Sequence, residues 1–272
     1  MELFSANNVK NILEKFSAKP KKSLGQNFLI DKNILQKIIE ASDIKSTDII
    51  LEVGPGVGTL TQELAKKAKQ VIAVEKDKAM IEILKENLKD FKNVEIINED
   101  ILKFKVPNLK YKVVANIPYY LTSPLIRKFL EEGTLPQEII LMIQKEVAER
   151  ICAKVPDMNL LAVSVQFYAE PKIAFNVSKN CFWPIPKVDS AIIKITPRVN
   201  SDNISPNLFF KIVKAGFSQP RKQIGGNLSK MLKIKKPEID DILIKNNITP
   251  NQRAETLTIS DWKNLTREII LK

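Results

Sequence analysis

Between residues 49 and 196, the chain alternates short apolar runs with segments whose apolar residues recur every three or four positions. A short apolar run indicates a buried strand, and the wider spacing indicates an amphipathic helix. We expect helices near 59–67, 77–89, 122–131 and 144–153, and strands near 49–53, 70–75, 93–97, 112–115, 138–143, 160–168, 171–176 and 189–196. This alternation predicts a parallel sheet with helices on both faces, completed by late strands that can pair antiparallel.

The hydrophobic pattern changes after Pro197. A polar stretch at 200–206 indicates a linker, and the segments beyond it have helical spacing, at 206–217, 219–233, 237–246 and 260–271. We therefore expect an α/β domain over residues 1–200, which includes a basic N-terminal arm over residues 1–30. A small helical domain is expected over residues 201–272.

The strand expected at 49–53 runs into a turn with glycine at alternate positions, Gly54, Gly56 and Gly58. Glycine is required where the backbone turns with positive φ or lies against a ligand with no side chain between them. A plain strand-to-helix turn needs one glycine rather than three. The dehydrogenase fingerprint does not fit either, because Thr59 and Thr61 occupy the positions where its last glycine would fall. The turn therefore predicts a ligand site.

An acidic residue ends the next strand, since Glu75 lies twenty-one residues after Gly54. A carboxylate at the tip of the second strand of a doubly wound sheet can accept hydrogen bonds from a ribose diol. With Glu52 ahead of the glycines, the stretch resembles the S-adenosylmethionine (AdoMet) site of class I methyltransferases. Asp100 sits where that family contacts the adenine ring. The resemblance implies a class I AdoMet-dependent methyltransferase fold, a Rossmann-like α/β sheet, and another nucleotide site is the alternative.

The strand expected at 112–115 leads directly into Asn116, Ile117, Pro118 and Tyr119. At the carboxyl end of a parallel strand, these residues face the same crevice as the glycine turn. The Asn116 side-chain oxygen and the Ile117 carbonyl can accept the two protons of an exocyclic aromatic amine. Pro118 would stiffen the turn, and Tyr119 would stack on the extruded base. The alternative is a tight loop with a buried tyrosine.

A second aromatic segment lies between Cys181 and Ser190, where two prolines stiffen a loop that presents Phe182 and Trp183. One of these rings could stack on the base opposite Tyr119. The alternative is that both rings belong to the core.

The chain contains no histidine and only two cysteines, Cys152 and Cys181. Zinc sites and Cys-His nucleophilic catalysis lack their usual residues, so we expect no metal site. Methyl transfer from a sulfonium tolerates the absence of histidine, because the cofactor carries its own leaving group. The sequence has no membrane-length apolar run and no signal-peptide pattern, so we expect a cytoplasmic protein that does not associate with a membrane.

The net charge of +12 is concentrated at the ends of the chain. Residues 1–30 carry five basic and two acidic side chains, and residues 198–272 carry fourteen basic and seven acidic ones. Basic ends around a nearly neutral centre favour a polyanionic partner, and solubilising lysine is the alternative. The candidate RNA-binding residues are Lys21, Lys22, Arg221 and Lys222.

Motifs along most of the chain resemble those of the ribosomal RNA adenine dimethyltransferases, in the small-subunit (kasugamycin-resistance) branch. These motifs are residues 22–29, 51–60, 74–77, 116–119, 144–150, 186–190 and 253–255. The last two favour this branch over the macrolide-resistance branch, which methylates one adenosine of large-subunit rRNA with the same core.

The resemblance implies AdoMet-dependent dimethylation of the exocyclic amines of two adjacent adenosines in the 3′-terminal hairpin of small-subunit (16S) rRNA. Four AdoMet molecules are used and S-adenosyl-L-homocysteine is the product. The implied partner is an immature 30S subunit, and we expect a monomer. The catalytic residues would be Asn116, Ile117, Pro118, Tyr119 and Phe182. The cofactor-binding residues would be Gln26, Asn27, Leu29, Glu52, Gly54, Gly56, Gly58, Glu75, Lys76, Asp100, Ile101 and Asn116.

Three features depart from the family pattern. Tyr120 stands where the family often has asparagine, and residues 156–163 lack the glycine usual before the next strand. Residues 224–227 replace a segment that is more often basic, which weakens any RNA contact assigned there.

Three other functions stay open at this point. They are methylation of large-subunit rRNA, DNA adenine methylation, and a non-catalytic role as an RNA-binding ribosome assembly factor. Intact Glu75, Asp100 and Asn116 argue against a loss of catalysis.

Overall fold

The computed structural model of the protein describes residues 3–106, 108–198 and 204–269. They form two compact units, each described here by itself. The first unit runs to Ala148 and resumes at Lys172–Pro197, and the second comprises Glu149–Pro171 and the chain from Arg198 onward. This division differs from the expected boundary near residue 200, because a segment from the middle of the chain groups with the helical end.

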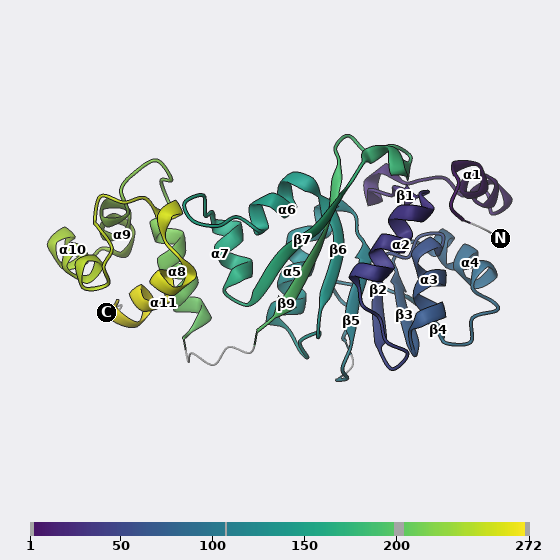
Figure 1. Cartoon of the computed structure of the whole chain (residues 1–272), viewed down its shortest axis with the longest axis horizontal. Coiled ribbons are helices and arrows are strands. Elements are labelled where there is room, and N and C mark those ends of the chain that lie inside the picture. Colours follow the sequence, from purple (N-terminus) through teal and green to yellow (C-terminus); the bar gives the residue numbers. More distant parts are fainter. Residues whose placement is uncertain (1–2, 107, 199–203, 270–272) are drawn as a thin grey trace. The chain divides into compact units, whose positions relative to one another are not determined.

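The first unit is built on a seven-stranded sheet with the order β4-β3-β2-β5-β6-β9-β7 (Figure 1). Its strands are β2 (Ile49–Val53), β3 (Gln70–Glu75), β4 (Val94–Asn98), β5 (Lys112–Asn116), β6 (Ile139–Gln144), β7 (Ala169–Val177) and β9 (Ser190–Pro197). The neighbours from β4 through β6 pair parallel, and β9 pairs antiparallel with β6, as the sequence predicts. Because the strand order reverses between β2 and β5, their carboxyl ends border a crevice suited to ligands.

Helices accompany the strands of this unit as α1 (Ala6–Lys15), α2 (Lys32–Ala41), α3 (Thr59–Lys67), α4 (Lys78–Asn87) and α5 (Thr122–Glu131). Helix α6 (Lys145–Ile151) begins in this unit and ends in the second one. Asp31 caps α2, since its Oδ1 accepts from the backbone N–H of Ile34 at 3.0 Å. Helices α2 and α3 cover one face of the sheet, where their side chains share a core cluster with residues of the strands. That cluster includes Leu35, Ile38, Leu60, Leu64, Ile50, Val71 and Val114.

The strand expected at 160–168 is wrong, because this segment forms helix α7 (Leu160–Gln166). The helix begins at Asn159, whose side-chain oxygen accepts from the backbone N–H groups of Leu161 at 3.1 Å and Ala162 at 3.0 Å. A short apolar run fits a buried strand or a buried helix equally well. The capping asparagine decides between them here, because it satisfies the first free N–H groups of a helix.

The second unit is helical. It contains α7, α8 (Pro206–Gly216), α9 (Ile224–Leu232), α10 (Lys236–Lys245) and α11 (Ile259–Glu268), close to the four expected helical segments. Most of the expected linker lies outside the described residues. One core holds the unit together around the fully buried Trp262, with Phe167, Phe209, Ile212, Leu228, Leu243 and Leu265. Phe167 and Phe209 stack with their ring centroids 4.1 Å apart.

This core leaves no room for a side chain at Gly216. A Cβ built there would overlap the indole of Trp262, whose ring is fully buried and cannot move aside. We expect Gly216→Ala to lower the free energy of unfolding by about 1–3 kcal/mol through overpacking. This loss exceeds the stabilisation that alanine gains from its better helix propensity. Thermal unfolding of the full chain checks this. The control is Gly226→Ala in α9, where a Cβ meets nothing within 4 Å and no loss of stability is expected.

Candidate active site

A pocket in the first unit lies at the carboxyl ends of β2, β3, β4 and β5. Of the sixteen different residues that the sequence predicts for catalysis or cofactor binding, only Gly58 does not line it. Gly58 instead begins α3, with φ of 92°. The residues that line the pocket without having been predicted include Leu24, Gly25, Phe28, Thr59, Leu60, Glu99, Leu102, Tyr120 and Leu121.

The glycine turn and the tip of β3 are joined by hydrogen bonds. The Glu75 carboxylate accepts from the backbone N–H of Gly56 at 3.2 Å and from that of Asp77 at 2.7 Å. Gly56 has φ of 59°, and a Cβ there would lie 3.1 Å from the ring of Phe28. Only glycine therefore allows the turn to approach both Glu75 and Phe28. The result is a rigid wall of backbone on one side of the pocket.

Two carboxylates make this wall electrostatically unusual. Glu52 is 1% exposed and Glu75 is 6% exposed. Burial raises the pKa of Glu52 to about 8, and burial also raises the pKa of Glu75, against the hydrogen bonds from the turn. The Oε2 atom of Glu52 has no hydrogen-bond partner among the residues that the structure describes. A buried carboxylate oxygen without a partner, at the wall of a pocket, favours a cationic ligand.

At the end of β4, Asp100 is held in place from two sides. Its carboxylate accepts from the Lys76 ammonium at 2.8 Å and from the backbone N–H of Leu102 at 3.0 Å. The bond from Lys76 keeps the pKa of Asp100 below its usual value, so Asp100 is an ionised acceptor. The neighbouring Ile101 is buried and presents an apolar surface to the pocket.

The turn after β5 is fixed by contacts to the N-terminal loop and to β9. Asn116 donates from Nδ2 to the backbone carbonyl of Asn27 at 3.2 Å, which leaves its Oδ1 as the remaining acceptor. The Tyr119 hydroxyl and the Ser190 hydroxyl share a hydrogen bond of 2.9 Å, and burial raises the pKa of Tyr119. Both ends of the turn are therefore positioned before any substrate arrives.

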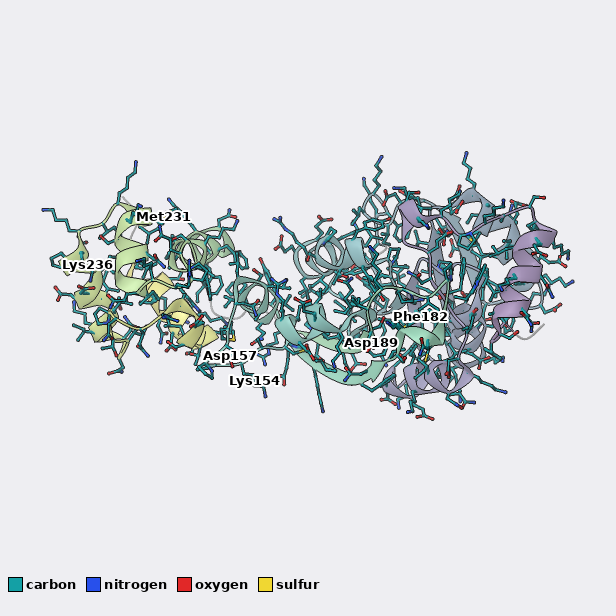
Figure 2. The ribbon with its side chains drawn as sticks, turned by 90° about the horizontal axis from the view of Figure 1, so that it is seen from above. Lys154, Asp157, Phe182, Asp189, Met231 and Lys236 are labelled. Carbon is teal, nitrogen blue, oxygen red and sulfur yellow. The ribbon has the colours of Figure 1, made fainter. Side chains whose placement is uncertain are left out.

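Phe182, the predicted stacking partner of the base, lies on a short strand that the sequence pattern does not predict. Phe182 and Trp183 form β8, which pairs antiparallel with β1 (Phe28–Leu29). Phe182 is buried and lines the pocket, whereas Trp183 does not line it and stacks on Phe28 instead. Figure 2 marks Phe182 on β8 and Asp189 at the end of the loop that follows β8. Asp189 accepts from the backbone N–H of Lys179 at 2.9 Å, in the turn before β8. Of the two candidate rings, only Phe182 reaches the pocket.

The N-terminal loop is bound to the start of α4 through an ion pair and a hydrogen bond to Asp77. Lys21 pairs with the Asp77 carboxylate at 2.6 Å, and Gln26 donates to it at 3.0 Å. Gln26 also accepts from the backbone N–H of Lys21 at 2.8 Å. Both polar groups of the Gln26 side chain are thus engaged in holding the loop, and Lys22 is left exposed.

The other two predicted RNA-binding residues, Arg221 and Lys222, lie in the second unit. They line a surface hollow together with Gln219, Gln223, Lys230, Asn251 and Arg253. The floor of the hollow is held by Asn227, which donates to the backbone carbonyls of Gly216 at 2.7 Å and Gln219 at 3.0 Å. The hollow therefore presents several basic groups in one place. The sequence departure at 224–227 forms the start of α9 beside them.

Among the described residues, no cluster of acidic and cysteine side chains could hold a metal ion. Within the same residues, no helix is both long and apolar enough to cross a bilayer.

Solved structures of known proteins are similar to this chain over most of its length. A crystal structure of a dimethyladenosine transferase from Plasmodium falciparum matches with a TM-score of 0.76 and 30% identity, covering 88% of this chain and 95% of that one. A crystal structure of the 23S rRNA methyltransferase ErmE matches with a TM-score of 0.74 and 27% identity, covering 89% of this chain and 98% of that one. Both likenesses extend over most of the chain, so the predicted class I methyltransferase fold is confirmed.

Curated relatives are more similar in sequence. A protein named ribosomal RNA small subunit methyltransferase A, from Dehalococcoides mccartyi, is 45% identical over 95% of this chain and 91% of its own length. A protein of the same name from Alkaliphilus oremlandii is 44% identical over 98% of each chain. A family model described as ribosomal RNA adenine dimethylase matches residues 17–269. This match spans nearly the whole sequence, and the chain belongs to the ribosomal RNA adenine dimethylase family.

Proposed function

We propose that the chain transfers methyl groups from AdoMet to the exocyclic amines of two adjacent adenosines in the 3′-terminal hairpin of small-subunit rRNA. The observation that carries this proposal is a shared pocket. The glycine turn with Glu75 and the Asn116 turn both line it, so a methyl donor and an amine acceptor can meet there. The name of the curated relatives supports the small subunit as the source of the RNA.

The residues present fit AdoMet. A sulfonium is permanently cationic, and Glu52 lines this pocket with a buried carboxylate oxygen that has no hydrogen-bond partner among the described residues. Glu75 would accept from the ribose hydroxyls, Asp100 from the adenine amine, and the backbone of Gly54 and Gly56 would lie against the ligand. When bound, the cofactor supplies an electrophilic methyl group with a neutral thioether as its leaving group.

The adenosine would be held by the turn after β5. The Asn116 Oδ1 and the Ile117 carbonyl would accept hydrogen bonds from the two N–H groups of the amine, which favours a pyramidal nitrogen whose lone pair is free to attack. Tyr119 and Phe182 hold the base between their rings, and Pro118 keeps the turn rigid. No general base is needed before the transfer, because the proton can leave for water after the new bond has formed.

The likeness to ErmE makes the large-subunit activity the second candidate. To decide between them, unmethylated small and large subunits are incubated separately with the chain and AdoMet, and the rRNA is mapped by mass. We expect two dimethylated adjacent adenosines in the small-subunit hairpin. Strong labelling of large-subunit rRNA, or of competing duplex DNA, would contradict the proposal. An absence of labelling in all samples would favour a non-catalytic assembly factor.

We propose further that the helical domain at the C-terminal end contacts RNA. Arg221 and Lys222 would neutralise phosphates from the basic hollow, and Lys22 would do so from the N-terminal arm. Lys21 is less available, since Asp77 already pairs with it. The partner would be an immature 30S subunit in the cytoplasm, with the chain acting as a monomer.

The titration of Glu52 gives the proposed cofactor binding a pH dependence. Its pKa is raised in the folded chain, so its contribution to stability is present at low pH and is lost as the pH rises toward 8. A cationic ligand needs the ionised form of Glu52, so the affinity for AdoMet should rise as the pH rises toward 8. We expect the Kd to rise about fivefold from pH 8 to pH 7, and by about tenfold per further unit of acidification. Calorimetry across this range checks it, and Glu52→Gln should flatten the profile.

A further inference from the structure

Tyr120 is an aromatic residue at this site that the proposed chemistry does not use. It lines the pocket, yet it is 55% exposed, so its ring lies at the pocket's mouth. Among the described residues, no hydrogen bond holds its side chain, whereas Ser190 fixes the preceding Tyr119. An exposed, untethered ring beside a pocket for a base is suited to stacking.

The surroundings of Tyr120 are basic on the side of the N-terminal loop. Gly25 ends the short turn Lys22–Leu24, and a Cβ at Gly25 would lie 3.9 Å from the Tyr120 ring and 3.2 Å from Pro118. The ring therefore lies close to the backbone of a turn that carries the exposed Lys22. A ring for a base beside a cation for a phosphate is the usual pairing in sites for single-stranded nucleic acid.

We propose that Tyr120 stacks on the nucleotide next to the target adenosine and so acts as a positioning residue for the second adenine of the pair. This inference rests on the proposed function. Tyr119 and Tyr120 are consecutive, with Cα atoms about 3.8 Å apart, so a base held at Tyr119 leaves its neighbour in the RNA close to Tyr120. With one base in the pocket, the other needs a surface at the mouth.

Stacking suits a neighbour whose chemistry changes during the reaction. Once an adenosine is dimethylated, its amine has no N–H left to donate, so a hydrogen-bonding site for the neighbour would reject it. The face of the ring stays available to Tyr120 in either state. The same surface can therefore hold an unmodified or a dimethylated neighbour while the other adenosine is in the pocket.

The test is a double-mutant cycle, in which the affinity for RNA is measured while the protein and the RNA are each altered. It requires no methyl transfer. The full chain, loaded with S-adenosyl-L-homocysteine, is titrated with a hairpin carrying two adjacent adenosines, and with two hairpins in which one or the other adenosine is abasic. We expect Tyr120→Ala to weaken binding of the intact hairpin about tenfold and Tyr120→Phe to keep it. On one of the abasic hairpins, Tyr120→Ala and the unaltered chain should bind equally, which also identifies the side on which the neighbour stacks.

Leu135→Ala is the matched control, because Leu135 is 39% exposed and does not line the pocket. It should not change the affinity for any of the three hairpins. An equal loss for Tyr120→Ala on all three hairpins would overturn the proposal. So would a loss of AdoMet affinity in the absence of RNA, since Tyr120 would then cover the cofactor. If the unaltered chain failed to methylate small subunits, the proposed function would fail. The affinities for the three hairpins could still be measured and would test the role of Tyr120 separately.

Discussion

Asn116→Ala is expected to lower kcat for methyl transfer by about a hundredfold or more, because it removes an acceptor that would hold the amine in line with the methyl donor. The Nδ2 of Asn116 is already committed to the carbonyl of Asn27, so the role of its Oδ1 toward substrate is oriented in advance. Affinity for RNA should change little, since the contacts to phosphates lie elsewhere. Single-turnover methylation of small subunits, with binding measured separately, checks both expectations.

The control for this variant is Asn93→Ala. Asn93 also donates its amide to backbone carbonyls, those of Ala65 at 2.8 Å and Ala68 at 3.1 Å, but it does so at the amino end of β4, away from the pocket. It should lose stability and retain kcat. If Asn116→Ala turned over normally, the proposed clamp on the amine would be wrong. If both variants lost kcat equally, the loss would come from folding rather than from the site.

The sheet and the pocket could be predicted from the sequence because their signals are local. Buried parallel strands are nearly continuous apolar runs, and glycine at alternate positions marks a turn whose φ angles other residues resist. The positive φ of Gly54, Gly56 and Gly58 agrees with this. Since strands of a parallel sheet end at one edge, residues that follow different strands were expected together, and Glu75 and Asn116 do line one pocket.

Other features depend on contacts between distant segments and carry little local signal. The apolar run at 160–166 is compatible with a strand or a helix, and the cap at Asn159 is the local signal that favours the helix. The hydrogen bond between Gln26 and Asp77 joins residues far apart in the sequence, so the sequence alone does not predict it. Gly25 does carry a local signal, because a glycine beside basic and amide residues favours a close approach of backbone, here to Pro118.

Glu75 provides the second large effect, since the loss of its charge should weaken AdoMet binding about tenfold to a hundredfold. Hydrogen bonds to a charged acceptor contribute about 1.5–3 kcal/mol each, and the ribose would lose such a bond in Glu75→Gln. The fold should survive. Burial raises the pKa of Glu75, so a neutral amide of the same shape removes a costly charge while keeping one acceptor for the glycine turn.

Calorimetry with AdoMet, paired with the Tm of the free chain, separates these two effects of Glu75→Gln. Glu95→Gln is the matched control, because Glu95 lies on β4 outside the pocket, where it accepts from the Gln70 amide at 3.2 Å. The control should bind AdoMet as the unaltered chain does. An unchanged affinity in Glu75→Gln, with an unchanged Tm, would mean that the ribose is held by another group. A collapse of Tm instead would mean that the carboxylate serves the glycine turn more than the cofactor, because it accepts from both Gly56 and Asp77.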